Sequence, residues 1–155
     1  MLERLVRHAV PGSECSVAAK RQLAELIVET APWRAALLAR DVLSFQDDDR
    51  AWGLLGLAHT LLGNHQSARH AYRRALRLAP GCASYAHNLG HLIDVVFDRP
   101  REALGWLRRA HLAAPEEAEI AASYAHALAR SERVHEATEV LTVALKSSES
   151  ALRLL

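Results

Sequence analysis

Cysteine is scarce in this chain of 155 residues, which has two, Cys15 and Cys82. They lie far apart and neither belongs to a C-x-x-C pair, which argues against a disulfide framework or a zinc ribbon. Glycine and proline are also few, at seven and five residues, so the sequence is not rich in linkers. The length therefore indicates one domain with a continuous core.

Long apolar runs are missing as well. No stretch approaches the roughly 20 apolar residues that span a bilayer. The N-terminal stretch MLERLVRHAVPGSE has Glu3, Arg4, Arg7 and His8 where a secretory signal needs apolar residues. We therefore expect a cytoplasmic protein without membrane insertion.

Neither sign of charge dominates, because 19 Lys and Arg face 18 Asp and Glu. A net charge of +1 gives no general attraction to nucleic acid, and aromatic residues, at 5%, offer few rings for base stacking. One basic cluster needs its own interpretation, and its members are Arg69, Arg73, Arg74, Arg77, Arg108 and Arg109. We expect a solvated outer face here and no nucleic-acid partner, with RNA or an acidic protein surface as the alternative.

Catalytic signatures are lacking too. The sequence contains no G-x-S-x-G, no P-loop, no G-x-G-x-x-G and no H-E-x-x-H. Its carboxylates are scattered at positions typical of solvated helix surfaces. We therefore expect neither enzymatic activity nor a cofactor.

The sequence does contain a helical pattern with bulky and small residues at set positions. Its clearest copy comprises Trp52, Leu55, Gly56, Ala68, Tyr72, Ala75 and Pro80. This pattern resembles the W-x2-L-G-x2-Y, A-x3-F, P signature of the tetratricopeptide repeat. The one departure is His59, which stands where that family prefers Tyr.

Further copies follow at a spacing of 34 to 35 residues, which takes Gly56 to Gly90 and then to Ala125. We expect these small residues to face Ala68, Ala103 and Ala137, because closely crossing helices require small side chains. The residues expected to fill the space around the crossings are Leu55, Tyr72, Leu89, Leu107, Tyr124 and Leu141. The second copy has one extra residue within VVFDRPRE, where we expect Asp98 to cap the next helix and Pro100 to lie in its first turn.

The resemblance implies an all-α fold, a right-handed solenoid of helix pairs stacked in chain order. The predicted single domain, 1–155, consists of a capping helix (1–12), a degenerate repeat (16–48), three repeats (49–82, 83–117 and 118–148) and a short C-terminal cap (149–155). Asp47, Asp48 and Asp49 are expected to cap the first clear repeat, with a cation site as the alternative. The leucines of the C-terminal cap, Leu152, Leu154 and Leu155, are expected to cover the end of the array. The alternative is that they form an association surface, so the terminal helices are candidates for homo-oligomerisation.

The resemblance also implies a function, a non-catalytic adaptor or scaffold that binds a segment of a protein or peptide partner. In this family the first helix of each pair lines a concave groove. The residues of this sequence at those positions are Arg50, Leu54, Leu57, Leu61, Ser84, His87, Asn88, His91, Asp94, Glu119, Ser123, His126 and Arg130. Asn88 matches an Asn that hydrogen-bonds the ligand backbone in many peptide-binding members. The carboxylate clamp for chaperone C-termini is not matched, because Gly53, Leu57, Glu119 and Ser123 occupy its places.

Four of these groove residues also raise an alternative function. His87 and His91 lie one helical turn apart, Asp94 follows three residues later, and His126 occupies the position in the third repeat that His91 has in the second. Imidazole and carboxylate groups are the ligands that zinc prefers. The alternative is therefore a metal- or pH-responsive binding module.

Overall fold

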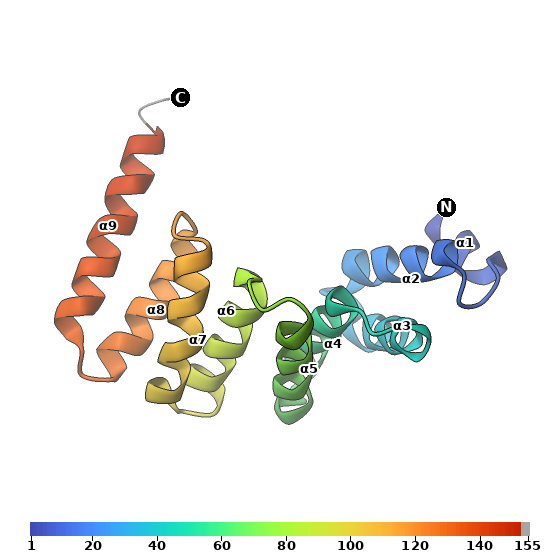
Figure 1. The fold of residues 1–155 in the computed structure, drawn as a ribbon, viewed down its shortest axis with the longest axis horizontal. Coiled ribbons are helices and arrows are strands. Elements are labelled where there is room, and N and C mark those ends of the chain that lie inside the picture. The colour runs from blue at the N-terminus through green and yellow to red at the C-terminus, as the bar shows by residue number, and fades with distance from the viewer. Residues whose placement is uncertain (153–155) are drawn as a thin grey trace. The chain divides into compact units, whose positions relative to one another are not determined.

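The computed structural model describes residues 1–152, and all regular structure within them is helical. The elements are α1 (Leu2–His8), α2 (Glu14–Ile27), α3 (Pro32–Phe45), α4 (Asp49–Leu61), α5 (His65–Leu78), α6 (Ala83–His91), η1 (Leu92–Val96), α7 (Pro100–Ala113), α8 (Ala118–Arg130) and α9 (Val134–Leu152) (Figure 1). The all-α prediction is confirmed. None of the helices in this part of the chain has the length and apolar character that a bilayer span requires.

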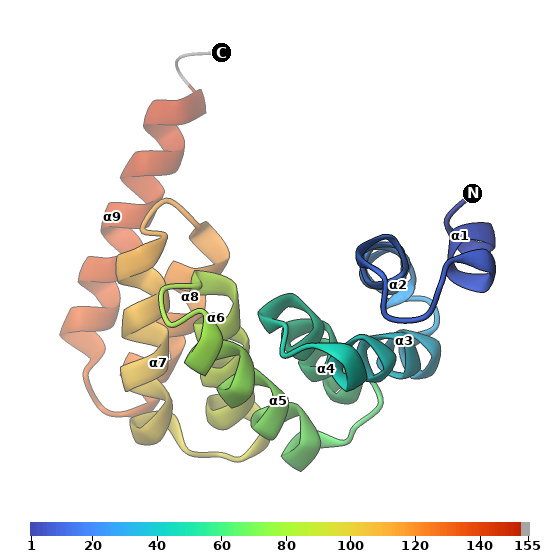
Figure 2. The same ribbon diagram turned by 45° about the vertical axis from the view of Figure 1, so that its right-hand side comes forward.

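The helices group into two compact units, residues 1–80 and residues 81–155. The first unit contains α1 to α5, and the second contains α6 to α9. Within each unit every helix packs against the next helix in the chain, as Figures 1 and 2 show from two directions. The predicted repeats 49–82 and 83–117 contain the pairs α4–α5 and α6–α7, and the repeat 118–148 contains α8 and all of α9 except its last four residues.

The helix starts follow from local sequence. Pro32 and Pro100 lie in the first turns of α3 and α7. Backbone N–H groups there have no acceptor within the helix, so the N–H that proline lacks costs no hydrogen bond. Asp48 is the N-cap of α4, and its Oδ1 accepts a hydrogen bond of 2.8 Å from the Ala51 N–H. Burial opposes ionisation of Asp48, but the Ala51 N–H and an Arg21 side chain 2.6 Å away outweigh it, so its pKa lies below the usual value. The expected cap is thus confirmed, and it also ties α2 to the start of α4.

The turns between paired helices share one backbone feature, a residue with positive φ. These residues are Gly63 (φ 75°), Asp98 (φ 54°) and Glu132 (φ 65°), one in each clear repeat. The expectation that Asp98 caps α7 is wrong, because the N-cap is Arg99. Asp98 instead supplies the left-handed turn that ends the preceding helix, a conformation that Asp tolerates better than most residues.

The extra residue of the second repeat is absorbed by a π-helical turn. After each positive-φ residue, a backbone N–H returns to the preceding helix: Asn64 to His59 (2.8 Å), Arg133 to Leu128 (2.9 Å) and Arg99 to Ile93 (3.0 Å). The first two bonds reach back five residues, whereas the third reaches back six. The π-helical turn of η1, immediately before it, accommodates the additional residue. Because of this, α6 ends in a wider turn that has no counterpart in α4 or α8.

The core is built largely from small side chains. In the first unit a buried cluster joins α2, α3, α4 and α5, and its members are Ala24, Val28, Ala35, Ala36, Ala39, Leu54, Leu55, Ala58 and Ala71. Six of these nine residues are alanine, which lets helix backbones approach closely. Of the six residues expected to fill the space around the crossings, five are buried, but Leu141 on α9 is 41% exposed.

Two glycines mark the closest crossings within the helix pairs. A Cβ built at Gly56 would lie 2.6 Å from Cε1 of Tyr72, and one built at Gly90 would lie 2.6 Å from Cγ of Leu107. The sequence placed Ala68 and Ala103 opposite these glycines, but the nearest side chains are the larger Tyr72 and Leu107. Glycine is therefore needed because it makes room for a bulky partner that occupies the space of its missing side chain.

The C-terminal cap does not form a helix of its own. Residues 149–152 continue α9 without a break. The prediction of a separate helix is wrong for these residues, and Leu154 and Leu155 lie outside the described part of the chain.

We expect Gly56→Ala to lower the free energy of unfolding by about 1–3 kcal/mol, because the added methyl group overpacks the Tyr72 contact. Gly105→Ala is the matched control, because Gly105 lies within α7 and a Cβ built there meets nothing within 4 Å. It should stabilise the helix by up to about 1 kcal/mol. Urea unfolding of the two variants tests this, and equal stabilities would contradict the packing argument.

Candidate functional site

The groove residues predicted in the first unit have different environments. Leu54 is buried in the alanine-rich core at 9% exposure, so it is unavailable to a partner, and its assignment to the groove is corrected. Leu57 is half-buried and packs against the same core. Leu61 remains 49% exposed, and Arg50 forms an ion pair with Glu25 of α2. Of the three predicted groove leucines, Leu54 is therefore covered, Leu57 is partly covered and Leu61 is open.

The groove residues predicted in the second unit come from α6 with its η1 extension and from α8. Side chains bridge these elements directly: His87 Nε2 lies 2.9 Å from Ser123 Oγ, and His126 Nδ1 lies 2.8 Å from Asp94 Oδ2. We call this surface the α6–α8 face, and it comprises Ser84, His87, Asn88, His91, Glu119, Ser123, His126 and Arg130, with Asp94 buried beneath it. Two pairs of residues that the family resemblance assigned to one groove, His87 with Ser123 and Asp94 with His126, are thus in contact.

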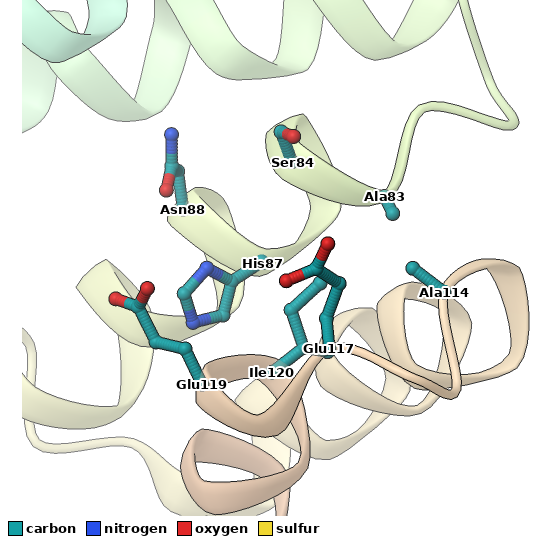
Figure 3. Close-up of a pocket in the computed structure, with 8 residues that line it drawn as sticks. All are labelled: Ala83, Ser84, His87, Asn88, Ala114, Glu117, Glu119 and Ile120. Carbon is teal, nitrogen blue, oxygen red and sulfur yellow. The ribbon is translucent and has the colours of Figure 1, made fainter. Parts of the chain in front are cut away.

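A pocket of about 400 Å³ opens at one end of the α6–α8 face (Figure 3). Its lining consists of Ala83, Ser84, His87, Asn88, Ala114, Glu117, Glu119 and Ile120. Four of these, Ser84, His87, Asn88 and Glu119, were predicted from the sequence. The other four are Ala83 at the start of α6, Ala114 and Glu117 in the α7–α8 loop, and Ile120 in the first turn of α8. Their positions depend on the path of the chain from α7 into α8 and on the start of α6.

The electrostatics of this pocket are acidic. Glu117 and Glu119 line it and form no ion pair within the described residues, and no Lys or Arg belongs to the lining. His87 lies beside Glu119 (Figure 3), and burial lowers the pKa of His87 more than the Glu119 carboxylate raises it. His87 is therefore predominantly neutral at pH 7, and the pocket carries a net negative charge.

Asp94 has a structural position that differs from the predicted one. Its side chain is buried, at 1% exposure, and Arg130 donates to its Oδ1 over 2.5 Å and to its carbonyl over 2.7 Å. His126 donates from Nδ1 to Oδ2, because a carboxylate can only accept. Arg130 also pairs with Asp98. Asp94 therefore joins η1 to α8 from the inside, and its assignment as a ligand-facing groove residue is corrected.

The metal alternative depends on His87, His91, Asp94 and His126 converging, but their side chains are engaged in other contacts. His87 contacts Ser123, whereas Asp94 and His126 contact each other. No group of three or more His, Cys, Asp or Glu side chains within residues 1–152 is arranged to hold a metal ion. Asp47 and Asp48 are likewise engaged, by Arg74 and Arg21.

The basic cluster is divided among different surroundings. Arg74 pairs with Asp47 over 3.0 Å and lies over the Trp52 ring, and Arg109 lies over the Trp106 ring. Arg73, Arg77 and Arg108 are exposed, whereas Arg69 is half-buried. The cluster is therefore not one continuous row of solvated guanidinium groups, and the absence of a nucleic-acid partner stays a prediction.

The comparison with known families matches residues 49–82, the pair α4–α5, to the tetratricopeptide repeat. This is the stretch that carries the Trp52-to-Pro80 pattern and the Gly56–Tyr72 crossing. This stretch is therefore a tetratricopeptide repeat. The solved structures that the chain resembles share its helical fold.

MamA matches with a TM-score of 0.84 at 18% sequence identity, over 98% of this chain and 87% of MamA. MamA from Desulfovibrio magneticus RS-1 gives a TM-score of 0.80 at 17% identity, over 96% of this chain and 82% of that one. YrrB, described as a TPR protein with an unusual peptide-binding site, gives a TM-score of 0.80 at 17% identity, over 94% of this chain and 74% of YrrB. At these identities the likeness shows the fold alone.

Among curated proteins, FlbA of Caulobacter vibrioides is 35% identical over 101 residues. The match covers 65% of this chain but 17% of FlbA, so the chain spans less than a fifth of the length of that relative.

We expect Arg130→Met to be more destabilising than Asp94→Asn. Removing the Arg130 guanidinium leaves a buried carboxylate without its main counter-charge, whereas Asp94→Asn leaves Arg130 free to remain with Asp98. The double variant should recover part of the loss, because it removes the buried charge. Urea unfolding of the four proteins gives the coupling energy, and additive effects would contradict a direct pair.

We also expect the protein to lose stability as the pH falls below about 6.5, the ordinary pKa of histidine. Burial lowers the pKa of His59 and of His87, so the unfolded chain binds more protons than the folded one in that range, and the stability is fully present above it. His87→Gln should reduce the difference between unfolding midpoints at pH 7.5 and pH 5.0, and replacing the exposed His8 by Gln should not. An unchanged difference in His87→Gln would mean that His87 is not the proton-linked group.

Proposed function

We propose that this chain is a non-catalytic protein-interaction adaptor or scaffold that binds a partner segment on its α6–α8 face. The acidic pocket at the end of that face is the observation that carries the proposal. A cavity of about 400 Å³ lies within the range of small-ligand and side-chain sites, and its polar groups converge from two helices. The described peptide-binding site of YrrB, a protein of the same fold, supports a peptide as the kind of ligand.

The charge of the pocket indicates what the segment carries. Glu117 and Glu119 have no cationic partner of their own, and His87 is kept neutral by burial. A Lys or Arg side chain entering the pocket would form a charge-assisted hydrogen bond with one of these carboxylates. We therefore expect a basic residue at the position of the partner segment that enters this pocket.

Asn88 supplies a second recognition element. Its side-chain amide is half-buried at the pocket wall and makes no hydrogen bond within the described residues. An amide has donors and an acceptor, so it can pair with one peptide unit of an extended or helical segment. This role agrees with the one that the family resemblance implies for Asn88.

In the first unit Leu61 offers exposed apolar surface at the end of α4, with the half-buried Leu57 one turn earlier. These two residues are a candidate contact for apolar side chains of a partner. The metal-responsive alternative is not favoured, because His126 and Arg130 both engage the Asp94 carboxylate. A cytoplasmic location and self-association through the terminal helices stay predictions.

Selection of random peptides displayed on phage tests the proposed function. We expect the enriched peptides to share a Lys or Arg, and Glu119→Gln to weaken a selected peptide by about 1–3 kcal/mol, the usual contribution of a hydrogen bond to a charged group. Asn88→Ala should weaken it by a similar amount, about 1–3 kcal/mol, because a paired amide is lost. Isothermal titration calorimetry measures each affinity.

The matched controls are Glu116→Gln and Asn64→Ala, which change exposed residues outside the pocket lining. Both should bind the selected peptide as the unchanged protein does. Peptides without a shared basic residue, or equal affinities for Glu119→Gln and Glu116→Gln, would place binding elsewhere than the α6–α8 face.

A further inference from the structure

The first unit contains a pocket of its own, of about 430 Å³, between α3, α4 and α5. Its lining consists of Arg40, Trp52, Leu55, His59, Gln66, Ser67, His70 and Ala71. None of these residues belongs to the predicted groove, and the proposed peptide-binding face lies in the other unit. This pocket is therefore separate from the site of the proposed function.

The charge of this pocket is opposite to that of the α6–α8 pocket. Arg40 contributes a guanidinium, and no Asp or Glu belongs to the lining. Arg40 forms no ion pair within the described residues, although it lies close enough to His59 to help burial lower the pKa of that imidazole. A guanidinium without a counter-ion at the edge of a cavity is a receptor for a planar anion, above all a carboxylate, which its forked donors match.

A further polar group of the lining also lacks a partner. The Nδ1 atom of His59 is buried and has no hydrogen-bond partner among residues 1–152, which is uncommon for a buried polar atom. Gln66 and Ser67 lie in the first turn of α5, where the N-cap Asn64 makes no side-chain hydrogen bond to the helix. The unpaired Nδ1 of His59 from α4 and the exposed side chains of Gln66 and Ser67 from α5 therefore line the same cavity as Arg40 from α3.

The remaining wall is apolar and held in place. The Trp52 indole donates to Asp47 Oδ1 over 2.5 Å, meets the His70 ring edge-on at 6.0 Å and has the Arg74 guanidinium 5.3 Å above it. Three contacts thus fix a large aromatic surface beside Leu55 and Ala71. A fixed aromatic wall favours an apolar body and costs little ordering when the ligand binds.

We propose that this pocket is a second binding site, which takes a carboxylate carried on an apolar body, with the carboxylate at Arg40 and the apolar part against Trp52. The C-terminal residue of a polypeptide and a small carboxylic acid share this chemistry. The cavity volume accommodates one large side chain with its carboxylate.

The probe is N-acetylphenylalanine, titrated into the full chain labelled with nitrogen-15 and compared with its primary amide. We expect the acid to shift the Trp52 indole signal and the backbone signals of His59 and Gln66, and to bind at least about tenfold more tightly than the amide, since hydrogen bonds to a charged group are worth that much. Arg40→Met should remove this preference. Arg77→Met is the matched control, because Arg77 is exposed on α5 outside the lining, and it should keep the preference.

A hexapeptide that ends in phenylalanine, with a free or an amidated C-terminus, separates the two sources. Binding of the free peptide at least as tight as that of N-acetylphenylalanine assigns the site to a polypeptide C-terminus, and tighter binding of the small acid assigns it to a small carboxylic acid. Equal binding of acid and amide, an unchanged affinity in Arg40→Met, or shifts confined to His87 and Asn88 would overturn the proposal. None of these outcomes decides the proposed function of the α6–α8 face, because the ligand expected there is basic and is tested with different peptides.

Discussion

Two helix pairs of this chain close because Gly56 and Gly90 have no side chain. The space that a Cβ would take is filled by Tyr72 in one pair and by Leu107 in the other, so a bulky residue of the second helix packs against the backbone of the first. Close contact of this kind lets a short helix pair bury a large side chain even though most of its core is alanine. The remaining faces of the first helices are then available for polar residues.

The α6–α8 face depends on a second constraint, the buried carboxylate of Asp94. A carboxylate placed inside a repeat must be paired, and here Arg130 and His126 of α8 satisfy it. The π-helical turn of η1 contains Asp94 and also accommodates the extra residue of the second repeat. A local irregularity of one helix therefore coincides with the contact that joins two repeats, while His87, Asn88 and Glu119 stay at the surface beside it.

The two pockets have opposite charges and lie in different units. The α6–α8 pocket has two carboxylates and no Lys or Arg in its lining, whereas the pocket between α3, α4 and α5 has one guanidinium and no carboxylate. Electrostatic selection of this kind discriminates between ligands more than it adds to affinity, because the wrong charge leaves a group unpaired. A chain with a net charge of +1 thus presents two local fields that its composition does not reveal.

The sequence by itself determined the fold class, the helix pairs and the surface shared by α6 and α8. The spacing of Gly56, Gly90 and Ala125 indicates repeats because the rule is local: small residues recur where helices cross, and helical periodicity assigns each position to a face. The family resemblance assigned Ser84, His87, Asn88 and Glu119 to one groove, and these four residues line one pocket.

Tertiary structure alone decided which of those positions remain free to bind. Leu54 and Asp94 lie on the predicted face, but the first is covered by the alanine-rich core and the second is enclosed by Arg130 and His126. Burial and pairing depend on neighbours 26 to 36 residues away, such as the core residue Val28 and the Arg130 side chain, and helical periodicity carries no information about them. The pocket of Arg40 and Trp52 was missed for the same reason, since its walls come from three helices whose contact exists only in the folded chain.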